Sequence, residues 1–334
     1  MSSNITWERH DVDGVWIGEA PGYNASQPTI AISGGVHGNE ETGVKYIDDL
    51  VSGKAGLNLD AGRIIAIHGN LEAMAMNDGK GARATEEGLN LNRSFKPLDP
   101  MYAAMDEKDR PYEINRGQEL MSKVLNNLNQ APEDRPKGLL DIHDFTFPGD
   151  PIFMIADPYF GPEGHDGEND GYAIARAIGS PIISSGWKDA DPGGSDGFMT
   201  SIGNLGICIE TGYRESSGSN MEFARGAAAR LVIAFGMFEG KLPPLFSENG
   251  QKPRFIWNEG PRVRKTDLPY KLVLPEQYRQ TFTRLPRGMA VAHMDGKLHR
   301  APLVKPKLII FPEPDVPKNT EAFYFGHEFD PKNS

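Results

Sequence analysis

The fold of this chain is constrained most by one loop, which joins a strand-like run to a helix-like run. Thr29–Ile32 is a short apolar run typical of a buried strand, and Val44–Val51 has the apolar spacing of a helix. The segment between them places His37 and Glu40 three residues apart, where the strand ends. In open α/β sheets, ligands bind outside the carboxyl ends of the strands. A His-x-x-Glu pair there is also half of a zinc site made of two histidines and a glutamate.

The first 240 residues predict an α/β fold with a mostly parallel, mixed sheet flanked by helices. Short apolar strands that are bounded by Gly and Pro and alternate with helices are typical of a parallel sheet covered on both faces. The predicted strands are Thr29–Ser33, Arg63–His68, Gly138–Ile142, Ile152–Ile155, Pro181–Ser184 and Gly206–Ile209. The predicted helices are Glu41–Val51, Asn115–Leu128, Tyr172–Ile178, Gly197–Ile202 and Met221–Phe238.

The sequence changes in character near Pro243 and Pro244. A chain of 334 residues exceeds the size at which one hydrophobic core usually keeps growing. We therefore expect two domains, a catalytic domain over residues 1–243 and a smaller C-terminal β domain over residues 244–334. The β-like runs of the second part are Tyr270–Leu274, Met289–His293, Leu308–Phe311 and Ala322–Phe325. The sequence leaves open whether this part is a separate domain or a β extension packed on the first.

Charge and composition narrow the class of partner. The formal net charge of −11 argues against nonspecific binding of nucleic acid, which needs a basic footprint. An anionic small molecule stays compatible, because one local arginine can outweigh a distant negative field. The only cysteine, Cys208, can form no internal disulfide. Residues 1–10 are polar, and no apolar run approaches the length of a membrane span. We expect a cytoplasmic protein that acts on a small molecule without a membrane partner, and a homo-oligomer is left open.

A third metal ligand and a base are found at the ends of two other predicted strands. His143 closes the apolar run Leu139–Ile142, so its strand would deliver it to the same edge of the sheet as His37. Asp141 lies on the same strand face and could hold the imidazole of His143 or of His37. Glu210 ends another apolar run, and burying such an acid without a purpose is costly. It is the candidate general base for a metal-activated water.

A cation for substrate recognition is offered by Asn90–Phe95, which contains Asn92 and Arg93 side by side. Arginine presents a planar fork that binds a carboxylate through two hydrogen bonds. Arg83 lies in a Gly-rich loop nearby and could polarise a carbonyl or hold its oxyanion. Residues 193–197 also match the Gly-x-Ser-x-Gly elbow of serine hydrolases. That elbow requires an apolar strand directly before it, and a polar, Pro-broken segment stands there instead, so we interpret the match as chance.

Five short motifs, in order and at fitting distances, resemble the succinylglutamate desuccinylase/aspartoacylase family of zinc enzymes. They are Gly34–Glu40, Gly69-Asn70, Asn90–Phe95, Asp141–His143 and Ile209–Gly212. The resemblance covers most of the first part of the chain, and the Pro-rich β tail is similar to the family's C-terminal domain. It implies a fold related to the zinc carboxypeptidases. It also implies an amidohydrolase that removes an N-acyl group from an amino acid or a related small amine.

The resemblance also implies roles for single residues. One Zn²⁺ per chain would be held by His37, Glu40 and His143, and Glu210 would be the general base. The other matching residues are Asn92 and Arg93 for the substrate carboxylate, Arg83 for the carbonyl, and Tyr324 as a tyrosine that the C-terminal domain lends to the site.

The chain departs from the family pattern at three places. Asn90 stands where the family often has Asp, and the spacing from Arg83 to Asn92 is longer than usual. Residues 195–205 lack the further arginine that aspartoacylases carry, for which Arg214 is a candidate substitute. The sequence therefore does not fix the acyl group or the amine. Two alternatives stay open: a metallocarboxypeptidase that acts on short peptides, and a non-catalytic protein that binds zinc or a ligand.

Overall fold

The structure is a computed structural model. It describes residues 3–86, 89–145, 152–157, 170–187, 192–240, 252–263, 270–294, 296–303, 307–312 and 321–331. In this part of the chain, none of the helices is both long and apolar enough to span a bilayer.

A twelve-stranded mixed sheet forms the centre of the molecule, in the order β1-β2-β4-β3-β5-β8-β6-β7-β9-β15-β14-β11. Its strands are β1 (Thr6–Arg9), β2 (Val15–Glu19), β3 (Thr29–Gly34), β4 (Arg63–His68), β5 (Gly138–Phe145), β6 (Phe153–Ala156), β7 (Ile182–Ser185), β8 (Leu205–Tyr213), β9 (Arg254–Val263), β11 (Thr283–Leu285), β14 (Lys307–Ile310) and β15 (Glu321–Glu328). The central strands β4, β3, β5 and β8 are parallel, whereas β6 runs antiparallel to β8. The carboxyl ends of β3, β5 and β8 therefore lie at one edge.

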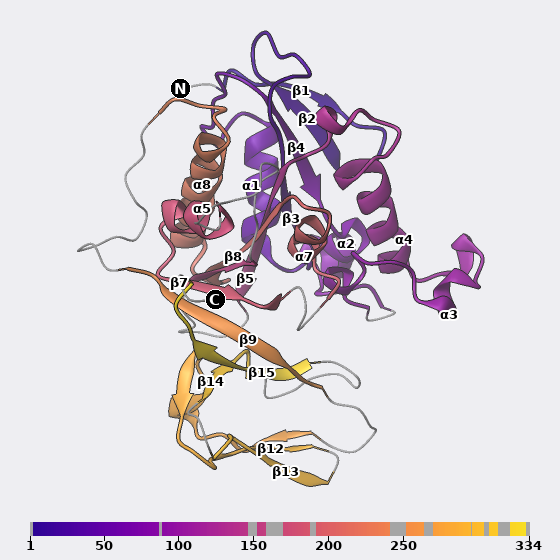
Figure 1. The fold of residues 1–334 in the computed structure, drawn as a ribbon. Coiled ribbons are helices and arrows are strands. Elements are labelled where there is room, and N and C mark those ends of the chain that lie inside the picture. Colours follow the sequence, from indigo (N-terminus) through magenta and orange to yellow (C-terminus); the bar gives the residue numbers. More distant parts are fainter. Residues whose placement is uncertain are drawn as a thin grey trace.

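Helices cover both faces of the first part of the sheet (Figure 1). On one face lie α1 (Glu41–Val51), α5 (Asp170–Ile178) and α8 (Ser217–Ala234). On the other lie α4 (Tyr112–Glu119), which continues into a π-helical segment (Leu120–Leu125), and α7 (Ser195–Ser201). The described residues also form α2 (Leu71–Gly79) and the short α3 (Pro100–Ala103), which projects from the body. Single 3-10 turns lie at Leu91–Arg93, Glu107–Asp109, Pro132–Asp134 and Glu276–Tyr278.

Alternating side chains of the central strands fill two separate cores. In β3, Ile30 and Ile32 belong to the cluster that includes Leu231 of α8, whereas Ala31 faces the cluster that includes Met199 of α7. This is the period of two expected for a strand buried on both faces. By the same alternation, the side chains of Asp141 and His143 lie on the face of β5 that packs toward α7, so their neighbours come from that side of the sheet.

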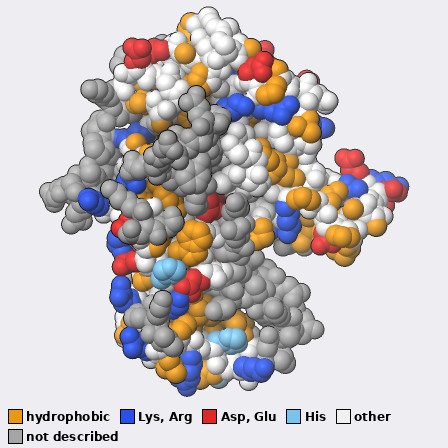
Figure 2. Space-filling view, in the orientation of Figure 1, with side chains coloured by type: hydrophobic (Ala, Val, Ile, Leu, Met, Phe, Trp, Pro, Cys, Tyr) orange, Lys and Arg blue, Asp and Glu red, His pale blue; other side chains and the backbone are white. Residues whose placement is uncertain are grey.

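The C-terminal strands continue the large sheet. Strand β9 pairs in parallel with β7, and β15 then pairs antiparallel with β9. A small second sheet, β10 (Lys271–Leu272), β12 (Ala290–Met294) and β13 (Lys297–Arg300), lies at the far end of this β-rich part (Figure 1). Lys and Arg are interspersed with Asp and Glu over the face of the molecule in Figure 2. The division into domains at residue 243 stays a prediction.

The predicted fold class is confirmed, and the differences from the predicted elements have local causes. The helix α1 has the bounds expected from its apolar spacing. The strand β5 extends three residues further than predicted, since it pairs with β8 as far as Phe145 and Tyr213. The hairpin of β1 and β2 was not predicted, because β1 is largely exposed and carries no apolar alternation.

Candidate metal centre and active site

His37, Glu40 and His143 converge into one buried cluster, called here the metal cluster. Their ligand atoms all lie within 4.8 Å of one another. His37 and Glu40 belong to the loop between β3 and α1, and Glu40 immediately precedes the helix. Glycine is required in this loop, because a Cβ at Gly38 would lie 2.4 Å from the main chain of α2. The sequence thus folds into a loop pressed against α2, with both side chains directed toward the end of β5.

Both histidines turn the same ring nitrogen toward the glutamate. His37 Nδ1 lies 2.7 Å from Glu40 Oε1, and His143 Nδ1 lies 2.8 Å from Glu40 Oε2. The two ring centroids are 5.1 Å apart. Two imidazole nitrogens and a carboxylate are three of the four ligands that a catalytic zinc uses, the fourth position being open to water or substrate. The donor set therefore fits a divalent transition metal.

The opposite nitrogen of each ring is held by a neighbouring side chain. His143 Nε2 lies 3.0 Å from Asp141 Oδ2, and His37 Nε2 lies 2.9 Å from Asn90 Oδ1. An acceptor at Nε2 keeps the proton there and leaves Nδ1 free to bind a metal. Of the two options left open by the sequence, Asp141 contacts His143. Asn90 was not predicted as the partner of His37.

The electrostatics of the cluster follow from burial and close charges. Burial, together with the Arg83 guanidinium, lowers the pKa of His37 to about 4. Burial opposes ionisation of Glu40, but the two histidines outweigh it and hold the pKa of that carboxyl well below its usual range. Burial likewise opposes protonation of His143, yet Asp141 and Glu40 raise its pKa well above the ordinary value. His37 is therefore neutral at pH 7, as a metal ligand must be.

Glu210 lies on β8 directly beside His143 on β5, since the two residues are partners in the register of these strands. Its side chain is buried. Burial raises the pKa of Glu210 to about 8, with His143 acting in the opposite direction and Glu40 adding to the rise. A carboxyl with a pKa near neutrality can both accept and return a proton, which suits a general base.

Asn92 and Arg93 lie in a short turn that also contains the partner of His37. The Asn92 main-chain N–H donates to Asn90 Oδ1 at 2.9 Å, and Asn92 Oδ1 accepts from the main-chain N–H of Ser195 at 3.2 Å. Arg93 Nη2 donates to the hydroxyl of Tyr324 at 3.2 Å. Tyr324 is a buried residue of β15, so a C-terminal strand contacts this turn directly.

Arg83 approaches the metal cluster from the solvent side. Its Nη1 lies 3.6 Å from Glu40 Oε1, while about half of its side chain is exposed. The loop that carries it is anchored two residues later, because Thr85 donates from its main-chain N–H and its hydroxyl to the buried Glu113. Arg83 is therefore near enough to meet a substrate at the cluster.

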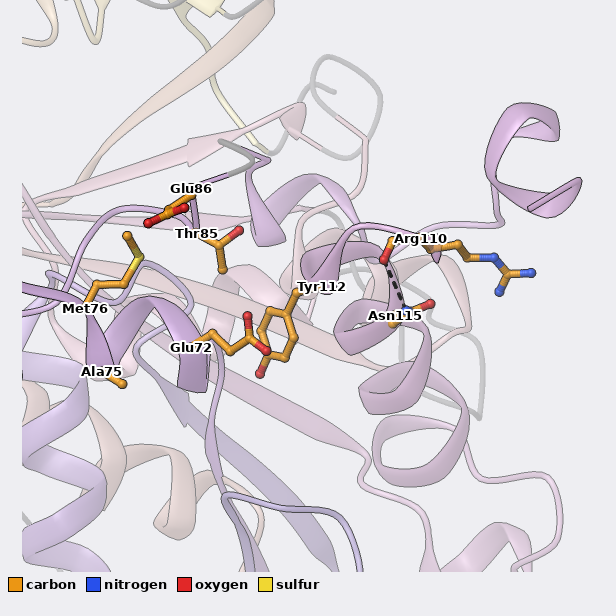
Figure 3. A pocket seen from close by; sticks show the side chains of 8 residues that line it. All are labelled: Glu72, Ala75, Met76, Thr85, Glu86, Arg110, Tyr112 and Asn115. Carbon is orange, nitrogen blue, oxygen red and sulfur yellow. Dashed lines mark hydrogen bonds between the residues drawn. The ribbon is translucent and has the colours of Figure 1, made fainter. Parts of the chain in front are cut away.

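A surface cavity of about 670 Å³ has Thr85 of this loop in its lining (Figure 3). It is lined by Glu72, Ala75, Met76, Thr85, Glu86, Arg110, Tyr112 and Asn115. Among the described residues, none that lines the cavity belongs to the metal cluster or to the turn of Asn92 and Arg93.

Ser195 of the Gly-x-Ser-x-Gly match is not arranged as a nucleophile. It is buried at the start of α7, and its hydroxyl donates to Asp141 Oδ2 rather than to a histidine. The other oxygen of that carboxylate accepts from Ser33 Oγ at 2.6 Å. The sequence analysis missed Ser33 and Ser195 as partners of Asp141. The only signal for Ser33 was its position at the end of the strand before the His-x-x-Glu loop.

The chain is similar to known proteins over most of its length. Residues 26–231 match the model of the succinylglutamate desuccinylase/aspartoacylase catalytic domain. A succinylglutamate desuccinylase from Pseudoalteromonas atlantica is 24% identical in an alignment of 301 positions, which covers 87% of this chain and 79% of the relative.

Two solved structures share the fold over nearly the whole chain. Succinylglutamate desuccinylase from Vibrio parahaemolyticus has a TM-score of 0.66 at 17% identity, covering 98% of this chain and 92% of the other. Murine aminoacylase 3 has a TM-score of 0.61 at 19% identity, covering 91% and 96%. The resemblance stated from the sequence motifs is thereby confirmed, and the chain belongs to the succinylglutamate desuccinylase/aspartoacylase family.

Proposed function

We propose that the protein is a zinc-dependent amidohydrolase that removes an N-acyl group from an amino acid or a related small amine. One observation carries the proposal above the others. Both histidines of the metal cluster turn Nδ1 toward Glu40 with Nε2 held from behind, and Glu210 stands beside His143. Binding alone would need the three ligands but no buried carboxyl at this position.

The metal would be held by His37, Glu40 and His143. When bound, Zn²⁺ would polarise the acyl carbonyl and make a water molecule more acidic. Glu210 takes a proton from the attacking water and passes it to the leaving amine nitrogen. A nearby cation lowers the pKa of a carboxyl, so a bound metal would favour the ionised form of Glu210. The acyl group leaves as a carboxylate and the amine is released.

The turn of Asn92 and Arg93 binds the carboxylate of the amino-acid part. The Arg93 guanidinium supplies the charge, and the hydroxyl of Tyr324 accepts one of its N–H groups and so fixes its direction. Arg83 stabilises the negative charge that develops on the carbonyl oxygen. The names of the relatives, two desuccinylases and an aminoacylase, support an acyl amino acid as the substrate class.

A screen of N-acyl amino acids and acyl diamines, read by release of free amine, tests the proposal with zinc-loaded protein. We expect hydrolysis of at least one acyl amino acid, and loss of it in Glu210→Gln at unchanged zinc content. Preference for acyl dipeptides and longer peptides would instead identify a metallocarboxypeptidase. Zinc binding without hydrolysis across the panel would indicate a non-catalytic binding protein.

A further inference from the structure

We propose that Ser195 is a positioning residue that ties the metal cluster to the turn that binds substrate. The inference rests on the proposed function, since it assigns a role toward the same metal and the same substrate carboxylate. It gives a purpose to the segment Gly193–Gly197, whose resemblance to a nucleophile elbow the structure does not support.

The hydroxyl of Ser195 acts toward the metal. It donates to Asp141 Oδ2, the same oxygen that lies 3.0 Å from His143 Nε2. Ser33 Oγ donates to the other oxygen, so the carboxylate is held from both sides. All of these groups are buried, and the three bonds together fix the plane of the Asp141 carboxylate. The direction of the His143 ring therefore depends on both serines.

The main chain of Ser195 acts toward the substrate. Its N–H donates to Asn92 at 3.2 Å, and an N–H group can donate only to the amide oxygen. This bond fixes which end of the Asn92 amide faces Ser195. The opposite end, the Nδ2 group with two N–H donors, is thereby directed away and is able to meet an anionic group. A freely rotating amide would present either end.

The same turn is also connected to the other histidine. Asn90 Oδ1 accepts both from His37 Nε2 at 2.9 Å and from the Asn92 main-chain N–H at 2.9 Å. His37 thus reaches Asn92 through Asn90, and His143 reaches it through Asp141 and Ser195. The two metal-binding rings and the substrate-binding amide form one hydrogen-bonded circuit, and Ser195 is the residue that closes it.

Gly193 allows the loop to lie close enough for this contact. Its φ is +112°, and a Cβ there would lie 2.7 Å from the carbonyl oxygen of Arg93. Its own carbonyl accepts from the Phe95 main-chain N–H at 3.0 Å. The loop is therefore held against the turn of Asn92 and Arg93 independently of Asp141. The contacts on the substrate side of Ser195 can thus be changed separately from those on its metal side.

Three variants distinguish the halves: Ser33→Ala, Gly193→Ala and Ser195→Ala. Zinc affinity is measured by competition with a chelator of known affinity, using Zn²⁺ alone as the probe. The KM and kcat are measured at saturating Zn²⁺ with the acyl amino acid that the wild type hydrolyses. Thermal unfolding confirms that each variant is folded.

The variants differ in which quantity they should change. Ser33→Ala removes one hydroxyl from Asp141 and should raise the zinc dissociation constant about threefold to tenfold, with KM within about twofold of wild type. Gly193→Ala displaces the loop from Arg93 and should raise KM about tenfold, with zinc affinity within about twofold. Ser195→Ala removes the hydroxyl bond to Asp141 but keeps the main-chain N–H that binds Asn92, so it should raise the zinc dissociation constant about threefold to tenfold and leave KM within about twofold of wild type.

The inference is overturned if Ser195→Ala binds zinc as the wild type does, or if Gly193→Ala leaves KM at the wild-type value. If Ser195→Ala does not fold, the KM of Gly193→Ala alone tests the inference. Failure of the proposed function would look different: the wild type itself would bind no zinc or hydrolyse nothing in the panel. If the wild type binds zinc but hydrolyses nothing, the zinc affinities of Ser195→Ala and Ser33→Ala still test whether Ser195 supports the metal cluster.

Discussion

Replacing Asp141 by Asn should weaken zinc binding about tenfold without unfolding the protein. Asp141 is completely buried and touches no candidate ligand atom directly, so the change acts only through His143. Asparagine has the same shape, and the chain can keep its geometry. The variant therefore isolates the negative charge behind the histidine from the contacts that orient it.

The magnitude follows from the three donors around the carboxylate. His143 Nε2 and Ser195 Oγ both point at Oδ2, whereas Ser33 Oγ alone points at Oδ1. An asparagine would place its oxygen at the two-donor side and its NH₂ toward Ser33, whose hydroxyl can rotate and accept. No hydrogen bond is then lost. Removing the partner of a metal-bound histidine typically costs 10-fold to 100-fold in affinity, or about 1.4–2.7 kcal/mol. Because the bonds survive, we expect the lower end.

Competition with a chromophoric chelator at pH 7 measures this effect directly. The control is Asp141→Ala, which leaves the His143 N–H and two serine hydroxyls without their acceptor, and which should lose at least about 100-fold in affinity and unfold at lower temperature. Zinc affinity within twofold of wild type in Asp141→Asn would refute the reasoning, because the charge on residue 141 would then have no influence on the cluster.

Three further outcomes are expected. Glu210→Gln should lower kcat by about 10²- to 10⁴-fold while zinc content, measured by atomic absorption, stays at wild type; retention of most activity would remove Glu210 from the mechanism. Tyr324→Phe removes the acceptor of an Arg93 N–H and should raise KM about fivefold, near 1 kcal/mol, with kcat little changed; steady-state kinetics with equal KM values would contradict this. Burial, with the charges of Asp157 and Asp141, raises the pKa of Asp196 to about 7 from 3.8. The protonated Asp196 therefore contributes its full stabilisation below pH 3.8, and this stabilisation is lost as the pH rises to about 7. By denaturant unfolding, Asp196→Asn should be more stable than wild type by up to about 4 kcal/mol at pH 8 and nearly equal to it at pH 4. A stability difference that does not depend on pH would contradict the raised pKa of Asp196.

The convergence of His37, Glu40 and His143 was predictable from the sequence, because His37 and Glu40 follow one buried strand and His143 ends another. Continuous apolar runs that end in a polar residue are informative: the run is buried, and parallel strands place their carboxyl ends together. This holds for His143 and Glu210, whose pairing in the register of β5 and β8 needed no knowledge of the intervening loops. The α/β fold was predictable for the same reason.

The partners behind the ligands were not predictable in the same way. Asn90, Ser33 and Ser195 are small polar residues of types that are common in loops, and nothing in their local pattern distinguishes them from solvated ones. Their roles depend on contacts with residues that lie 53 positions away for Asn90, 108 for Ser33 and 54 for Ser195. Such contacts arise from tertiary packing, where short side chains reach one particular neighbour only after the helix is in place.

Charge balance connects these partners to the metal. The cluster and its supporting residues include two buried carboxylates, Glu40 and Asp141, both with the pKa lowered. A divalent cation would offset the charge of these two carboxylates, while Glu210 and the Arg83 guanidinium lie close by. An aspartate in place of the partly buried Asn90 would add a further negative charge beside His37. Asn90 supplies the same oxygen to His37 without that charge. The two metal-binding rings are therefore supported by one neutral amide and one carboxylate, so that a single negative charge stands behind them.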